Sequence, residues 1–227
     1  MKLCVALDLP SKEENLSLCK ELREFNIWLK VGFRSFIRDG KDFLEEIKSI
    51  NSSFKIFLDL KLYDIPNTMA DAAEEIASLG ADMFNVHASS GEKAMKEVMK
   101  RLERFEKRPL VLAVTALTSF DRESFKKIYN DDLEKKAVEF AKSAFSCGLD
   151  GVVCSVFESL KIKESTDRNF LTLTPGIRPF GEDGGDQKRV GNIEVAKEYG
   201  SDFIVVGRPV YKAENPKDVV ERILRKI

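Results

Sequence analysis

Asp59, Lys61 and Asp64 lie within one short stretch, FLDLKLYDIPNT at 57–68, and are residue types that could carry proton chemistry. On a strand, side chains two positions apart share a face, so Asp59 and Lys61 are expected to point the same way, opposite to the leucines beside them. Burying such charges is costly unless they are paired. Flanking carboxylates favour a protonated lysine, which is a poor base and a good positioned proton donor. The alternative is an ion-pair cluster with a structural role.

Two glycine-containing stretches carry groups suited to a phosphate: TPGIRPFGEDGGDQKRV (174–190) and VVGRPVY (205–211). A glycine-rich loop presents backbone N–H groups, and an arginine or glutamine side chain adds further donors. Either loop alone is equally consistent with a plain connection. Together, each with an arginine, they favour a phosphorylated ligand. The residues expected to bind it are Arg178, Gln187, Gly207 and Arg208.

Other polar candidates are weaker. In TALTSF at 115–120, the hydroxyl groups of Thr118 and Ser119 could read an amide or a pyrimidine edge, although local turn hydrogen bonds explain them equally simply. His87 and Asn85 are as consistent with a structural role as with a ligand contact. The aromatic residues Trp28, Phe33 and Phe36 are expected in the core.

Eight short apolar runs must position these residues, and helix-like segments separate them. The runs are LCVALDL (3–9), WLKVG (28–32), FKIFLDLKL (54–62), MFNVHA (83–88), LVLAVTAL (110–117), GVVCS (151–155), FLTLTPGI (170–177) and FIVVG (203–207). Helix signals support the alternation, since Ser11 with Glu14 forms a capping box and Asn215-Pro216 opens the last helix. Glycines end helices before three of the runs, at Gly80, Gly148 and Gly200.

Strict alternation of apolar strands and helices predicts an α/β fold with a parallel sheet. Eight units in 227 residues fit a (β/α)8 TIM barrel that forms a single domain over residues 1–227. An open doubly wound sheet is the alternative. In a barrel the active site lies at the C-terminal ends of the strands. The polar residues at or just past those ends are Asp8, Lys30, Asp59, Lys61, His87, Thr118, Arg178 and Arg208.

Composition excludes several classes of protein. Lys plus Arg total 37 against 38 for Asp plus Glu, so no basic field attracts nucleic acid or an anionic membrane. No apolar run is long enough to span a bilayer, and MKLCVALDLP is too short and acidic for a signal peptide. Four scattered cysteines favour reduced thiols in the cytoplasm. With one histidine, His87, a multi-histidine metal site is excluded, no metal is expected, and catalysis would depend on Lys and Asp.

The chain resembles the orotidine 5′-phosphate decarboxylase family, bacterial type, through an ordered set of motifs that spans nearly its whole length. The motifs are VALDL, LKVG (29–32), DLKLYDIPNT (59–68), NVHAS (85–89), LTS (117–119), TPGIRPFGEDGGDQKRV and VVGRPVY. Tyr63 departs slightly from the pattern, where many members of the family have His or another aromatic residue.

The resemblance implies decarboxylation of orotidine 5′-monophosphate (OMP) to uridine 5′-monophosphate (UMP), the last step of de novo pyrimidine biosynthesis, without a cofactor. Lys61 would deliver a proton to C6 as carbon dioxide leaves. Asp59 and Asp64 would lie around the departing carboxylate. Asp8 and Lys30 would hold the ribose hydroxyls and extend the charged network.

The remaining site residues are also assigned by the resemblance. Asp64, Ile65 and Thr68 would reach the neighbouring subunit's site, which implies a homodimer. Thr118, together with Ser119, would read the pyrimidine. The phosphate would be held by Arg178, Gln187, Gly207 and Arg208.

Three rival functions stay open. A magnesium-dependent sugar-phosphate decarboxylase or synthase would share the D-x-K-x-x-D core, but those enzymes lack DIPNT and the long glutamine-bearing loop. An aldolase would use Lys61 as a Schiff-base nucleophile. A non-catalytic nucleotide-binding protein would retain the fold without turnover.

Overall fold

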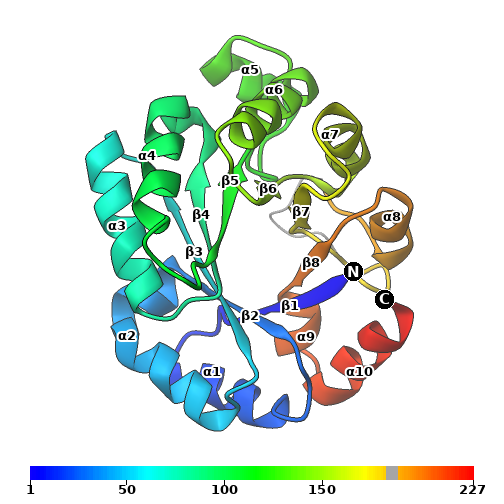
Figure 1. Cartoon of the computed structure of the whole chain (residues 1–227). Coiled ribbons are helices and arrows are strands. Elements are labelled where there is room, and N and C mark those ends of the chain that lie inside the picture. The colour runs from blue at the N-terminus through cyan, green and yellow to red at the C-terminus, as the bar shows by residue number, and fades with distance from the viewer. Residues whose placement is uncertain (183–188) are drawn as a thin grey trace.

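Eight parallel strands close into a barrel in chain order in the computed structural model, which describes residues 1–182 and 189–227 (Figure 1). The strands are β1 (Lys2–Ala6), β2 (Trp28–Gly32), β3 (Lys55–Leu62), β4 (Met83–His87), β5 (Leu110–Val114), β6 (Gly151–Val153), β7 (Leu171–Thr174) and β8 (Phe203–Val206). Closure rests on parallel pairing of β1 with β8, in which Leu3 lies opposite Ile204. The predicted (β/α)8 barrel is confirmed, and the open sheet is excluded.

Helices surround the barrel on its outer side, as Figure 1 shows. They are α1 (Lys12–Glu21), α2 (Phe33–Ile50), α3 (Pro66–Ser78), α4 (Glu92–Leu102), α5 (Arg122–Tyr129), α6 (Leu133–Ser146), α7 (Ser159–Ser165), α8 (Ile193–Glu198), α9 (Arg208–Tyr211) and α10 (Pro216–Lys226), with the 3₁₀ helices η1 (Ala88–Ser90) and η2 (Val156–Glu158).

The predicted helix boundaries have the expected chemistry. Ser11 and Glu14 form a reciprocal capping box at the start of α1. The side chain of Asn215 accepts the Asp218 N–H ahead of α10, whose first residue is proline. Gly80 and Gly148, which follow α3 and α6, have φ values of 74° and 80°, a conformation that glycine adopts without steric penalty.

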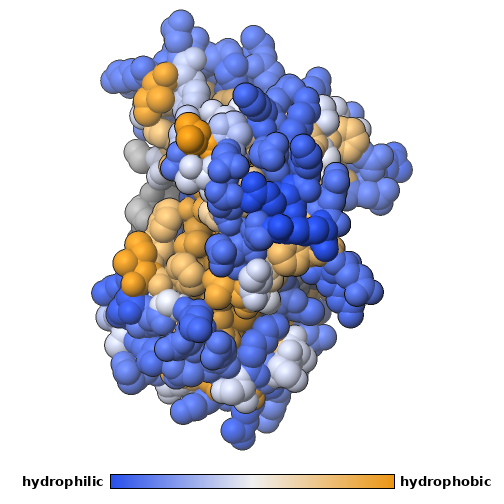
Figure 2. All heavy atoms as spheres, turned by 60° about the vertical axis from the view of Figure 1, so that its left-hand side comes forward, coloured by the Kyte–Doolittle hydropathy of each residue, from blue (hydrophilic) through white to orange (hydrophobic). Residues whose placement is uncertain are grey.

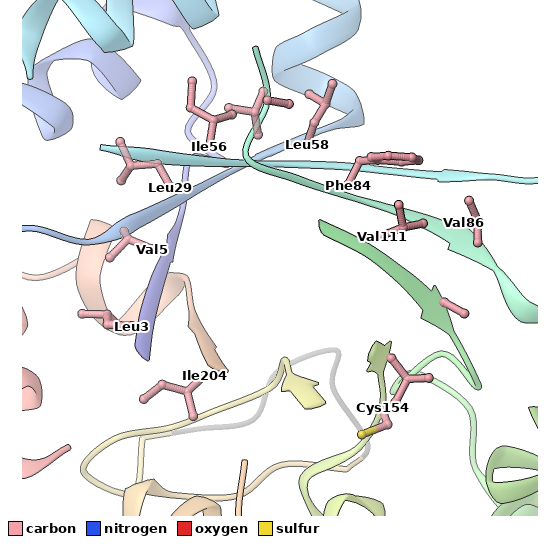
Figure 3. Close-up of a cluster of buried hydrophobic side chains, with 14 of the residues drawn as sticks. Leu3, Val5, Leu29, Ile56, Leu58, Phe84, Val86, Val111, Cys154 and Ile204 are labelled. Atoms are coloured by element: carbon pink, nitrogen blue, oxygen red, sulfur yellow. The ribbon is translucent and has the colours of Figure 1, made fainter. Parts of the chain in front are cut away.

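Side chains alternate along each strand between two apolar clusters. One fills the barrel interior and includes Cys4, Phe57, Met83 and Phe203. The other lies between the barrel and the helices; Figure 3 shows strand residues of this cluster such as Leu29, Leu58 and Phe84. Each buried Leu, Ile or Phe side chain contributes about 1.5–3 kcal/mol. The interior cluster supports the floor of the barrel mouth, where the interior positions of β3 and β4 become polar.

Polar and charged side chains cover most of the face in Figure 2, with an apolar area near its centre. Large apolar side chains that are exposed include Ile37, Tyr63, Ile65 and Phe33. The expectation that Phe33 is core was wrong, because its side chain is 51% exposed at the start of α2.

All four cysteines are buried free thiols, as expected from their spacing. Across residues 1–182 and 189–227, none of the helices has the length and apolar character that crossing a membrane requires.

Candidate active site

A cavity of about 470 Å³ opens at the C-terminal ends of the strands. Its volume lies within the range of small-molecule sites. Strands and loops from both halves of the chain line it. The predicted site residues that line it are Asp8, Lys30, Asp59, Lys61, Thr118, Ser119, Arg178, Gly207 and Arg208.

Four of these residues form one charged network across three neighbouring strands. Lys30 Nζ lies 3.1 Å from Asp8 Oδ1 and 3.4 Å from Asp59 Oδ2. Lys61 Nζ lies 2.7 Å from the other oxygen of Asp59. The sheet register produces this order, since Lys30 pairs with Ala6 of β1 while Asp59 pairs with Gly32 of β2. Cations and carboxylates therefore alternate along the network.

The network holds Asp59 ionised despite its burial. Burial acts to raise the pKa of Asp59, but the charges of Lys30 and Lys61 and the hydrogen bonds from Lys61 and Asn85 outweigh it, so the pKa lies below its ordinary value. Burial acts to lower the pKa of Lys30, and the charges of Asp59 and Asp8 outweigh it, so that pKa is raised. Both groups are thus charged at neutral pH.

Gly32 leaves room for the pair between Lys30 and Asp8. A Cβ atom at this position would lie 3.1 Å from Lys30 Nζ and 3.5 Å from Asp8 Oδ1. A larger residue would therefore press directly on the network. The sequence motif LKVG contained this glycine, but its role depends on a neighbouring strand and was not predicted.

Across the cavity, Arg178 is 6% exposed, and its Nη1 donates to the Ile177 carbonyl at 3.2 Å. Its backbone N–H donates to the Gly191 carbonyl at 2.8 Å, and Ile177 forms a parallel bridge with Gly191. Both ends of the predicted phosphate loop are thus tied together at the barrel mouth. Gln187, the remaining residue predicted to bind phosphate, lies outside the described residues.

Arg189 is a residue that sequence reasoning missed. It forms an ion pair with Glu158, whose side chain is 4% exposed. Its Nη2 also donates to the carbonyls of Ala116 and Leu117, each at 3.2 Å. Arg189 therefore links the end of the 178–190 loop to the segment just before Thr118. A second arginine in that loop was the available signal.

His87 lies beside the network and does not line the cavity. Its ring stacks on Tyr63, with ring centroids 5.5 Å apart, and its Nδ1 lies 2.6 Å from the Ser89 hydroxyl. Burial, with the nearby charge of Lys61, lowers the pKa of His87. The ring is therefore neutral at physiological pH.

Asp64, Ile65 and Thr68 do not line the cavity of their own chain. All three are exposed, and the Asp64 carboxylate accepts the N–H of Ile65 at 2.7 Å. Lys61 pairs with Asp59 rather than with Asp64. Within one chain, therefore, the D-x-K-x-x-D pattern supplies one carboxylate to the lysine and directs the other outward.

No group of three or more His, Cys, Asp or Glu side chains with the arrangement of a metal site occurs in the part of the chain that the structure describes.

The polar residues of this protein thus gather where (β/α)8-barrel enzymes place their active sites, at the C-terminal ends of the strands. The fold and the charged residues that line the cavity together place this protein among the (β/α)8-barrel enzymes. A sequence profile for the orotidine 5′-phosphate decarboxylase / HUMPS family matches residues 1–223, and the chain belongs to that family.

Individual relatives agree with this assignment. Orotidine 5′-phosphate decarboxylase of Sulfurimonas denitrificans is 67% identical to this chain over 227 residues, and the alignment covers 100% of both proteins. The enzyme of the same name from Nautilia profundicola is 69% identical over 229 residues, which cover 100% of this chain and 99% of that protein. Among solved structures, orotidine 5′-phosphate decarboxylase of Lactobacillus acidophilus superposes with a TM-score of 0.86 at 34% identity, covering 99% of this chain and 98% of the other.

Proposed function

We propose that this chain decarboxylates OMP to UMP, the last step of de novo pyrimidine biosynthesis, and does so without a cofactor. The observation that carries the proposal is the position of Asp59. It lies between Lys30 and Lys61 in a cavity that Arg178 and Arg208 also line. A charged network for chemistry and cationic groups for a phosphate therefore share one site.

The network suits loss of carbon dioxide followed by protonation. A substrate carboxylate about 4 Å from Asp59 would be repelled by about 4 kcal/mol at an effective dielectric constant near 20. The repulsion is relieved as carbon dioxide departs, while negative charge grows at C6 and attracts the Lys61 ammonium. Lys61 then delivers its proton to C6. Both effects favour the transition state over the bound substrate, as catalysis requires.

The other cavity residues would bind the remaining parts of the nucleotide. Asp8 and Lys30 would hold the ribose hydroxyls. Thr118 and Ser119 would bind the pyrimidine edge through their hydroxyl groups. The phosphate would be bound by Arg178, Gln187, Gly207 and Arg208. Such remote contacts can contribute to the chemistry, because they hold the reacting carbon in place.

A homodimer would complete the site. Asp64, Ile65 and Thr68 are exposed and do not line the cavity of their own chain, which suits a role in the neighbouring subunit's site. Asp64 would there add a second carboxylate near the departing group. We also place the enzyme in the cytoplasm, where its four buried thiols would stay reduced.

The decisive experiment mixes purified protein with OMP in EDTA and follows the ultraviolet absorbance of the pyrimidine. Loss of the substrate signal is expected. Turnover that EDTA abolishes and magnesium restores would contradict the cofactor-free reaction. No turnover of OMP and no binding of UMP would favour the magnesium-dependent sugar-phosphate rivals. Tight UMP binding without turnover would indicate a binding protein. Covalent trapping by borohydride with a sugar phosphate would favour a Schiff-base aldolase.

Arg208→Ala tests the phosphate assignment separately. Losing hydrogen bonds to a charged ligand should weaken UMP binding by about 10–100-fold and slow turnover without abolishing it. Isothermal titration calorimetry with UMP and with uridine distinguishes the two contributions, because only UMP binding should weaken. Equal affinity for UMP in the variant and the wild type would remove Arg208 from the phosphate site.

A further inference from the structure

Strand β3 changes register against β4 at the point where it enters the cavity. Leu58 lies opposite Phe84 and Leu62 lies opposite Val86, so β3 advances four residues while β4 advances two. The segment 59–61 therefore faces a single interior residue of β4, Asn85. A bulge of this kind redirects side chains and leaves backbone groups without their sheet partners.

Lys61 lies in this bulge with a φ of 44°, in the left-handed region that residues with a Cβ atom seldom occupy. Such a conformation persists only where the surroundings hold it. The backbone N–H of Lys61 is held by one group, the Asn85 side-chain oxygen, at 2.7 Å.

The other half of the same amide holds the carboxylate partner of Lys61. Asn85 Nδ2 donates to Asp59 Oδ1 at 2.7 Å, the same oxygen that accepts Lys61 Nζ at 2.7 Å. Asn85 is 0% exposed. The network fixes the amide orientation, because the reverse orientation would place an N–H₂ group against the Lys61 N–H.

We infer that Asn85 is a positioning residue for the proton donor: its amide fixes the backbone of Lys61 with one end and the Asp59 carboxylate with the other. This inference deepens the proposed decarboxylase function and rests on it. Asparagine suits the position because it offers an acceptor and a donor on one short, planar group. Aspartate would offer acceptors only, and leucine would offer neither.

Asn85→Leu should lower kcat by about 100-fold or more, because small displacements of catalytic groups have effects of this size. UMP affinity should change by less than about threefold, since Asn85 is not a lining residue of the cavity. The matched control is Thr172→Val, which removes a buried hydroxyl 2.7 Å from Ser159 Oγ on the outer side of β7. Its kcat should match the wild type.

Asn85→Asp is the second variant, and it retains the shape of the side chain if Asn85→Leu fails to fold. The new carboxylate would lie against that of Asp59. The other charged or titratable groups nearby are Lys61 on β3, Lys30 on the far side of Asp59, and His87 on β4 itself. On β5, the residue opposite position 85 is the apolar Leu112. A proton on the new carboxylate at position 85 restores the donor to Asp59 that the Asn85 amide supplies. The kcat ratio of variant to wild type should therefore rise about threefold or more as the pH falls from about 9 to about 6.

Amide hydrogen exchange at Lys61 provides a readout that does not depend on turnover. Exchange should be at least about tenfold faster in Asn85→Leu than in the wild type, and unchanged in Thr172→Val. Failure of the wild type to decarboxylate OMP would overturn the proposed function and leave this exchange test standing. In folded Asn85→Leu, a kcat within threefold of the wild type, unchanged Lys61 exchange, or a parallel loss of UMP affinity would overturn the inference.

Discussion

Each end of strand β3 has an aspartate held by two lysines, and the two clusters differ in what else the aspartate bonds. At the N-terminal end, the Asp82 carboxylate lies 2.8 Å from Lys55 and 3.1 Å from Lys48. It also accepts the backbone N–H of Ile56 at 2.9 Å. The carboxylate therefore fastens the start of β4 to the backbone of β3, next to two solvent-accessible cations.

At the C-terminal end, within residues 1–182 and 189–227, Asp59 bonds only side chains. Its partners are Lys30, Lys61 and Asn85, and the cluster borders the cavity. Carboxylate oxygens that hold no backbone group add nothing to the hydrogen bonding of the sheet. They instead set the charge and position of the groups that would meet a substrate. The same two residue types thus bond the backbone of the sheet at one end of the strand and border the cavity at the other.

The N-terminal arrangement recurs around the barrel. Asp150 accepts the Val111 N–H at 2.7 Å, and Asp202 accepts the Thr172 N–H at 2.8 Å. Both carboxylates also pair with a cation, from Arg108 and Lys163. Each aspartate precedes an even-numbered strand and follows a helix-ending glycine by two residues. The Asp59 network differs, because its partners are side chains at the cavity rather than the backbone of a neighbouring strand.

The largest difference in kcat is expected between Lys61→Ala and Lys55→Ala, which remove one lysine from each end of β3. Loss of the proton donor should lower kcat by about 10³-fold or more, with UMP binding largely retained. Lys55→Ala should leave kcat unchanged and cost at most about 1 kcal/mol of stability, as for an exposed ion pair. Steady-state kinetics and urea unfolding measure both. Near wild-type turnover in Lys61→Ala would remove the mechanism.

The aspartates should separate activity from stability. Asp59→Asn should lower kcat/KM by about 10²–10³-fold, because it removes the charge that repels the substrate carboxylate and orients Lys61. Asp82→Asn should leave kcat/KM within about twofold of the wild type and lower the free energy of unfolding by about 1–3 kcal/mol. If Asp82→Asn impaired catalysis as strongly as Asp59→Asn, the two ends of β3 would not be functionally distinct.

Gly32→Ala should act more weakly on the same network. Gly32 has a φ of −94°, which alanine also adopts without strain, so the backbone need not change. The new Cβ atom would press on Lys30 Nζ, which must move by a few tenths of an ångström. A rise in KM of about tenfold is expected with a nearly constant melting temperature. A large fall in melting temperature with normal KM would assign Gly32 to packing instead.

Much of the barrel and its mouth was predictable because both follow from periodicity. Eight apolar runs separated by helices require parallel strands, and parallel strands bring their C-terminal ends together. Asp8 follows β1, while Lys30 and Asp59 lie within the neighbouring strands β2 and β3, so their proximity needs no knowledge of side-chain geometry. Alternation likewise predicted that Asp59 and Lys61 share one face of β3, and both line the cavity.

Features that depend on contacts between distant segments were not predictable in this way. Alternation gives no sign of the register shift in β3. The sequence therefore could not predict that the Asn85 side chain bonds both the Lys61 backbone and the Asp59 carboxylate. The glycines that end helices were recognised. The aspartates two residues after them were not, because each bonds a strand that lies one or two helices earlier in the chain. Phe33 was assigned to the core from its residue type alone, although its side chain is 51% exposed at the start of α2.

The smallest expected effect concerns the pH dependence of stability at Asp82. Burial acts to raise its pKa, but hydrogen bonds from Lys55, the Ile56 N–H and Lys48 outweigh it and lower the pKa below the ordinary value. The carboxylate therefore contributes stability above its unfolded pKa of about 3.9, and this contribution is lost as the pH falls through the lower folded value. The free energies of unfolding of the wild type and Asp82→Asn should differ at pH 7 and converge in acid. Urea unfolding at both pH values tests this, with the exposed Asp42→Asn as control; a constant difference would show that Asp82 acts through packing rather than charge.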